Sequence, residues 1–248
     1  MKHLPIAANM KMADVIHLDY LLLPIIGRFG IDLGFGNKTV KEVCREKQIH
    51  LSFLLEILNS YHNHDYFAED QFQDYPTTLI VDYLINTHSY YINSKIPELE
   101  AMVEKFINIS SEENKSNNEL IANFFNEYKQ ELIRHLNQEE KNLFPYTREL
   151  ERIYASGEIS AEILKKIAKN EIAHNDDHHQ LEEKLFDLKN LIIKFLPPVK
   201  QKNIMEKLLI ELFQLENDLN DHSRIEDKVL IPKVIQLEQK IVSLSDTH

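Results

Sequence analysis

The most constraining feature of this sequence is a phrase that occurs twice, 87 positions apart, inside segments patterned like helix cores. Its two copies are HLNQEEKNLFP at 135–145 and HSRIEDKVLIP at 222–232. Each copy places a Glu four residues after its His, so the two side chains leave the same face of a helix. The chain must therefore fold so that two helices turn a His and a Glu toward an otherwise apolar interior.

Four long helical patterns follow residue 76, with apolar residues at alternating spacings of three and four. They are separated by polar or proline-containing breaks at 108–118, 154–160 and 195–200. The chain has only five Gly in 248 residues, which is few for a protein with many tight strand turns. We therefore predict an all-α fold in which the four patterns form an antiparallel, up-down four-helix bundle.

Three regions are predicted along the chain. Residues 1–62 form a small helical N-terminal domain, in which Thr39 can cap the helix VKEVCREK. Residues 63–75 are polar and aromatic without a clear period and are interpreted as a linker. The bundle occupies 76–248, and Pro76 suits the first turn of its first helix.

Histidines interrupt the apolar stripe of every bundle helix. The residues concerned are His88 in the first, His135 with Glu139 in the second, His174 and His178 in the third, and His222 with Glu226 in the fourth. Antiparallel neighbours place residues equally far from a shared turn at the same height, at about 1.5 Å per residue. Counted in this way, the four groups fall in one layer of the bundle.

A layer of imidazoles and carboxylates inside an apolar core needs compensation, because an isolated buried carboxylate is costly. Two metal ions provide it, since carboxylates can bridge two cations while imidazoles complete each coordination sphere. The imidazole content favours iron over Mg or Ca, and zinc or manganese suits the same donors. A single core His satisfied by a backbone carbonyl is the commoner case, but the duplicated motif argues against it for the set.

Composition excludes several classes of protein. The net charge is −12 and the isoelectric point is near 5.5, which disfavours a nucleic-acid or anionic-membrane surface. Cys44 is the only cysteine, so an intrachain disulfide and an iron–sulfur cluster held by four cysteines of one chain are excluded. No signal-peptide core or membrane-length apolar run is evident, and we expect a cytoplasmic protein without a membrane partner.

Two minor features of the sequence are the single cysteine, whose reactivity is left open, and the remaining histidines. Arg45 and Lys47 close to Cys44 would lower the pKa of its thiol, whereas burial would make the thiol inert. The histidines outside the bundle layer are interpreted as ordinary surface or linker residues, although His62-Asn63-His64 could bind a stray metal; they are His3, His17, His50, His62, His64 and His248.

At these motifs the chain resembles the hemerythrin-like HHE cation-binding family and, within it, the di-iron RIC (repair of iron centres) proteins. The resemblance is carried by VDYLINTHSYYINSKIPEL at 81–99, by the two repeated phrases and by DDHHQLEEKLFDLK at 176–189. It implies a hemerythrin-like bundle holding two non-heme iron ions, bridged by both Glu and by an oxo, hydroxo or water ligand. The implied ligands are His88, His135, Glu139, His178, His222 and Glu226. His178 is preferred over His174 for its distance to the double proline, Pro197-Pro198.

The N-terminal stretch at 12–47 is similar to the short N-terminal domain of the same family. In that family an Asp is followed by two cysteines, but here Asp32 is followed by Leu33-Gly34-Phe35-Gly36. The residues for any thiol chemistry of that domain are thus missing.

The resemblance implies a role in iron–sulfur cluster repair under nitric oxide or oxidative stress, by iron donation or redox handling at the iron pair. The expected partners are a small oxidant, nitric oxide or oxygen, and damaged iron–sulfur proteins. The alternative is an oxygen or nitric oxide sensor that signals through its N-terminal domain, where 38–58 reads as two helices joined by a short turn. The sequence leaves open whether the chain is an enzyme and what its oligomeric state is.

Overall fold

The structure, a computed structural model, describes residues 4–67, 69–109, 115–169, 177–195 and 202–245. Within these ranges every regular element is helical, and the one extended pairing is an isolated bridge between Lys11 and Thr39. The predicted all-α class is therefore confirmed. None of the described helices combines the length and the apolar character needed to cross a membrane.

The chain divides into two compact units, each built from segments distant in the sequence. Unit 1 consists of Met1–Tyr90 and Arg224–Ile235, and unit 2 of Tyr91–Ser223 and Gln236–His248. Residues of the predicted bundle, 76–248, thus contribute to both units. The predicted domain boundaries and the up-down order of the whole bundle stay predictions.

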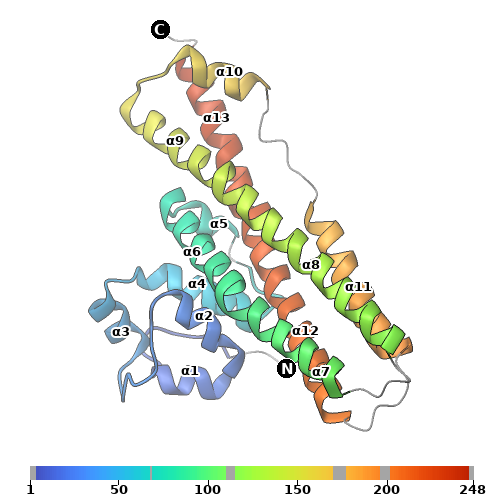
Figure 1. The fold of residues 1–248 in the computed structure, drawn as a ribbon. Helices are drawn as coiled ribbons and strands as arrows, with labels where there is room; N and C mark the ends of the chain where they lie inside the picture. Colours follow the sequence, from blue (N-terminus) through green and yellow to red (C-terminus); the bar gives the residue numbers. More distant parts are fainter. Residues whose placement is uncertain (1–3, 68, 110–114, 170–176, 196–201, 246–248) are drawn as a thin grey trace. The chain divides into compact units, whose positions relative to one another are not determined.

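Unit 1 is made of short helices (Figure 1). Its core contains aromatic side chains, among them Phe53 and Phe72. Its elements are α1 (Met12–Leu18), the 3₁₀ turn η1 (Tyr20–Leu22), α2 (Leu23–Arg28), α3 (Val40–Lys47), α4 (Leu51–His62), α5 (Glu69–Gln73), α6 (Thr77–Tyr90) and the π-helical segment η4 (Glu226–Leu230). The ring of Phe53 in α4 meets those of Tyr75 and Tyr83 edge-on, at centroid distances of 5.2 and 6.0 Å. Edge-to-face pairs of this kind stabilise a core beyond the area that they bury.

The start of α3 confirms the predicted cap. The Thr39 hydroxyl accepts a hydrogen bond from the Glu42 amide at 3.3 Å, and the Glu42 carboxylate accepts one from the Thr39 amide at 2.8 Å. This capping box satisfies two backbone donors at the helix start. Just upstream, Gly34 and Gly36 take φ of 102° and 60°, where a side chain would be strained. The stretch that carries cysteines in the resembled family is therefore a glycine-dependent turn here.

The segment predicted as a linker, 63–75, contains regular structure. It includes α5, and the Nζ of Lys233 donates to the carbonyl of Gln73 at 2.6 Å. Phe72 in α5 is fully buried. The segment is thus part of the packed interior of unit 1.

Unit 2 contains the long helices. Its elements are the π-helical segment η2 (Tyr91–Lys95), α7 (Ile96–Ile109), α8 (Lys115–Lys141), α9 (Leu143–Ser156), α10 (Ala161–Lys169), α11 (Asp177–Phe195), α12 (Lys202–Ile225) as far as Ser223, and α13 (Ile231–Ser245) from Gln236. Helices α8 and α11 lie side by side (Figure 1). They run in opposite directions, because Lys184 pairs with Glu131 while the earlier His178 meets the later His135.

Two lysines are buried inside unit 2, each against a glutamate of α12. Lys189 of α11 pairs with Glu216, and Lys95 of η2 pairs with Glu211. The lysines are 3% and 5% exposed. Since an uncompensated buried ammonium is very costly, the two pairs hold α11 and η2 against defined positions of α12.

Prolines interrupt the helices shortly after three of the predicted ligands. Pro97, Pro145 and Pro232 lie nine or ten residues after a bundle histidine, and each follows a π-helical segment or a turn. Proline lacks the amide hydrogen that would bond the carbonyl four residues earlier, so the α-helical ladder cannot continue through it. The α-helical register therefore changes close to these ligands, and Glu226 is itself the first residue of η4.

This change of register explains where the predicted core pattern was wrong. Of the stripe predicted for the first helix, Val81, Leu84, His88, Tyr91 and Leu99 are buried, whereas Ile92 and Met102 are only partly buried. Val103 and Phe106 lie in the core in place of Met102. A π-helical turn contains one residue more than an α-helical turn, so η2 moves the buried face along by one position. In α8, which has no such segment before its ligands, the predicted stripe from Ile121 to His135 is buried.

Candidate metal centre

Three of the predicted ligands converge in unit 2. The Nε2 of His135 lies 3.1 Å from Oε1 of Glu139, and the Nε2 of His178 lies 3.5 Å from the same oxygen. The two imidazole rings have centroids 4.7 Å apart and are nearly perpendicular. Their ligand atoms all lie within 4.8 Å of one another, close enough to share one ion. We call these three residues the unit 2 cluster.

The helices explain why the cluster forms. His135 and Glu139 are one turn apart on α8, so they project from one face. His178 is the second residue of α11 and reaches the same place because α11 runs antiparallel to α8. Local spacing therefore supplies two ligands, and helix packing supplies the third.

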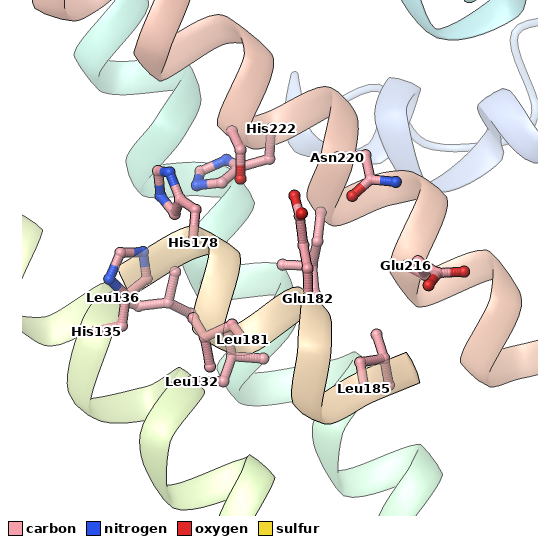
Figure 2. A pocket seen from close by; sticks show the side chains of 12 residues that line it. Leu132, His135, Leu136, His178, Leu181, Glu182, Leu185, Glu216, Asn220 and His222 are labelled. Atoms are coloured by element: carbon pink, nitrogen blue, oxygen red, sulfur yellow. The ribbon is translucent and has the colours of Figure 1, made fainter. Parts of the chain in front are cut away.

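A pocket in unit 2 opens beside the cluster. It lies between α8, α11 and α12 and has about 380 Å³ of empty volume, which includes space open to solvent. Figure 2 shows the rings of His135, His178 and His222 approaching one side of it from three different helices. Leucines of all three helices form most of the remaining wall, and Glu182, Glu216 and Asn220 add polar groups.

Unit 1 brings the other two predicted ligands together. The Nε2 of His88, near the end of α6, lies 4.0 Å from Oε1 of Glu226, the first residue of η4. The His88 side chain has no exposed surface and that of Glu226 is 1% exposed. We call these residues the unit 1 pair.

The donor chemistry fits a metal. Four of the six predicted ligands are more than nine-tenths buried; they are His88, His135, His222 and Glu226. Among the described residues the buried Nε2 of His135 makes no hydrogen bond, and its ion-pair contact is the acceptor-only carboxylate of Glu139. Imidazole nitrogens facing carboxylate oxygens in a dry interior are the donors that iron, zinc and manganese bind. The residues present are thus consistent with a bound cation.

Several residues named in the sequence analysis lie outside the part of the chain that the structure describes. His174, the alternative third-helix ligand, lies outside the described residues, as do Pro197 and Pro198. His178 is described and belongs to the unit 2 cluster. His3 and His248 also lie outside the described residues.

The prediction that His62 is an ordinary surface or linker residue was wrong. Its side chain is 7% exposed, and its Nδ1 lies 2.9 Å from Oδ2 of Asp19. The partner is 43 residues away in the sequence, so local pattern gave no indication of the pair.

Of the two alternatives for Cys44, an activated thiol or a buried and inert one, the structure supports the buried thiol. It is 2% exposed, and burial raises its pKa to about 11. The neighbouring cations Arg45 and Lys47 do not offset this, because both side chains lie on the exposed part of α3. Thiolate chemistry is therefore suppressed at the only cysteine of the chain.

Sequence reasoning also missed polar groups next to the ligands. The hydroxyl of Tyr91 donates to Oδ1 of Asp218 at 2.9 Å, and the Tyr91 ring lies edge-on to His222. Burial, and then the charge of Glu216, raise the pKa of Tyr128 far above its ordinary value. A tyrosine in a helical stripe is by default a core residue, and only the long-range contacts distinguish Tyr91 from the other tyrosines.

Inward-facing His and Glu on neighbouring helices are typical of helical cation-binding proteins. The model of the Hemerythrin HHE cation binding domain matches residues 80–234, well over half of the chain. The chain therefore belongs to the hemerythrin HHE cation-binding family. All six predicted ligands lie inside the matched range.

Curated relatives are similar over nearly the whole chain. The iron–sulfur cluster repair protein ScdA of Staphylococcus haemolyticus is 22% identical over 224 residues, covering 90% of this chain and 96% of that protein. The iron–sulfur cluster repair protein YtfE of Yersinia pestis is 23% identical over 203 residues, covering 82% and 86%. YtfE of Yersinia pseudotuberculosis matches to the same extent.

Proposed function

We propose that the unit 1 pair, the unit 2 cluster and His222 together bind two iron ions. The observation that carries this proposal is the unit 2 cluster, in which three ligand atoms from two helices share one small volume. His222 and Glu226 lie four residues apart in consecutive helical segments, which repeats the spacing of His135 and Glu139. The family match across 80–234 supports treating all six residues as one ligand set.

Each residue has a role in this arrangement. Glu139 and Glu226 would supply carboxylate ligands to the two ions, and the four imidazoles would complete their coordination. Bound iron would supply one-electron redox chemistry between its ferrous and ferric states and an exchangeable coordination position. The leucine walls of the pocket restrict water, and the pocket gives a small molecule a route to the His135 and His178 side.

We further propose that the chain repairs iron–sulfur clusters in the cytoplasm under nitric oxide or oxidative stress, by donating iron or handling the oxidant. The names of its relatives, which align over most of their length, support this role. Its partners would be a small oxidant and damaged iron–sulfur proteins. The raised pKa of Cys44 and the Leu33-Gly34-Phe35-Gly36 turn disfavour any mechanism through a thiol of this chain.

A sensor role is the second candidate, and one contact favours it. Arg224, located between His222 and Glu226 in the sequence, donates to the carbonyls of Ser60 and His64 at 2.9 and 3.0 Å. These carbonyls belong to the last turn of α4 and the residues just after it. A shift of the segment from His222 to Glu226 would therefore move Arg224 and change its hydrogen bonds to the N-terminal part of unit 1.

Anaerobic iron loading tests the metal proposal. We expect about two irons per chain by metal analysis, an absorption change on adding nitric oxide, and loss of iron in Glu139→Ala and Glu226→Ala. Glu140→Ala, one residue around the helix, is the matched control and should keep its iron. Iron-free protein after loading, or full retention in both glutamate variants, would rule the centre out.

A second experiment distinguishes the repair role from the sensor role. Iron-loaded protein is mixed with an oxidant-damaged [4Fe–4S] protein, and recovery of cluster absorption is followed. Arg224→Leu should leave recovery unchanged if the chain is an iron donor. If the chain is a sensor, the wild type gives no recovery.

A further inference from the structure

Tyr91 bridges one turn of the ligand helix in unit 2. It is the first residue of η2 and is fully buried. Its hydroxyl donates to Oδ1 of Asp218 at 2.9 Å, and its ring centroid lies 5.7 Å from that of His222, at an interplanar angle of 83°. Asp218 and His222 are four residues apart on α12, so one tyrosine contacts two successive positions of the same helix face.

The position of Tyr91 depends on an unusual backbone. The π-helical turn at Tyr91–Lys95 is followed by Pro97, and it sets both Tyr91 and Lys95 against α12. Such single π turns often occur at functional sites. An ordinary α-helical continuation would displace at least one of these two contacts.

The His222 side chain is buried but borders the pocket on one side. It lines the pocket together with His135 and His178 (Figure 2), and a pocket wall restricts a side chain less than a packed core does. Metal ligands generally depend on neighbouring groups that fix the direction of the ring. Tyr91 is a rigid group that packs on His222 and is itself held in place by a carboxylate.

We propose that Tyr91, held by its hydrogen bond to Asp218, is a positioning residue that fixes the imidazole of His222 for metal binding. The proposal rests on the proposed function, because it assumes that His222 is a ligand. It assigns no proton or electron transfer to Tyr91. The hydroxyl holds the ring, and the ring restricts rotation of the imidazole.

The test begins with the metal-free protein. Histidine ring resonances are recorded by ¹⁵N–¹H NMR for the wild type and Tyr91→Phe, with His222 assigned from its loss in His222→Gln. Tyr91→Phe keeps the ring but removes the hydroxyl, and we expect the His222 resonances to shift and broaden. Asp218→Asn retains an acceptor oxygen for the Tyr91 hydroxyl, so this single variant should keep the wild-type spectrum. Asp218→Leu removes the acceptor and should give the same spectrum as Tyr91→Phe.

Tyr146→Phe is the matched control. Tyr146 of α9 is also largely buried and also donates to a carboxylate, Glu238, at 2.6 Å. The two variants thus lose the same kind of hydrogen bond, and only Tyr91→Phe should change the His222 resonances. Competition with a chelator should show a 10- to 100-fold weaker affinity for ferrous iron in Tyr91→Phe, the range typical for loss of a supporting group around a metal.

The outcomes separate the two proposals. If Tyr91→Phe matches Tyr146→Phe in both the spectra and the affinity, the positioning role is wrong, while loss of iron in His222→Gln still supports the metal centre. If His222→Gln itself binds iron as the wild type does, the proposed ligand set has failed, whatever Tyr91 does.

Discussion

The unit 1 pair and the unit 2 cluster contain the same two kinds of side chain but differ in access. His88 and Glu226 have 0% and 1% exposed side chains, whereas Glu139 and His178 have 12% and 17%. The unit 2 cluster also adjoins the pocket between α8, α11 and α12. Under the proposed function, exchange of water, oxidant or metal takes place on the unit 2 side.

The two regions also differ in how their charges are held. In unit 2, lysines of other elements reach carboxylates of α12 in the interior, as Lys189 does with Glu216. In unit 1 the pair of Lys38 with Glu46 is exposed, with side chains that are 46% and 48% exposed. The unit 2 pairs hold the helix positions strongly, because separating them leaves the buried ammonium of the lysine without solvent. Exposed pairs contribute little.

The largest expected effect is on iron retention. It differs between Glu226, a predicted ligand without solvent access, and His178, a predicted ligand beside the pocket. Glu226→Ala should reduce iron from about two per chain to less than about one, because no solvent reaches the vacated position to replace the carboxylate. His178→Ala should keep more than about one, since a water from the pocket can take the place of the imidazole. Metal analysis after desalting measures both. Equal losses would show that access does not govern retention.

Next in size is the buried ion pair. Glu216→Ala should lower the free energy of unfolding by about 3 kcal/mol, because the buried ammonium of Lys189 loses its partner. Lys38→Ala should lower it by no more than about 0.5 kcal/mol. Urea denaturation of both variants gives the comparison. A similar cost for the two would contradict the distinction between the regions.

The reactivity of Cys44 is a test confined to unit 1. A pKa of about 11 in place of 9.0 leaves about 100-fold less thiolate at pH 8, so a disulfide reagent should react at least about 100-fold more slowly with the folded chain than with the urea-unfolded chain. The rate is followed by absorbance of the released thiol. A fast reaction in the folded state would mean that unit 1 opens readily or that the thiol is activated.

The smallest expected effect concerns the cap of α3. Thr39→Ala should cost about 1 kcal/mol of stability at pH 7. The hydrogen bond from the Thr39 amide, followed by that from the Thr39 hydroxyl, lowers the pKa of Glu42. A lowered folded pKa stabilises the protein above the ordinary value of 4.5, and this contribution is lost as the pH falls through the folded pKa. Denaturation at pH 7 and pH 3 should therefore show a smaller difference between Thr39→Ala and wild type at the lower pH.

Sequence reasoning was accurate where one helix determines the result. The one-turn spacing of His135 and Glu139, the cap at Thr39 and the buried stripe of α8 are all confirmed, because each depends on residues three or four positions apart. It was inaccurate at Met102, whose place in the core is taken by Val103 after the π-helical segment, and at His62, whose partner Asp19 is distant in the sequence.

By itself, the sequence determined the all-α class, the family and the residues able to bind a metal, since helix periodicity and donor chemistry are local properties. The tertiary structure decided which histidine of α11 meets Glu139, that Cys44 is inert, and that Tyr91 reaches Asp218 from 127 residues away. These contacts depend on helix packing and on the register changes near Pro97, Pro145 and Pro232. No local sequence pattern encodes the helix packing or these register changes, because both depend on how distant segments fill a shared interior.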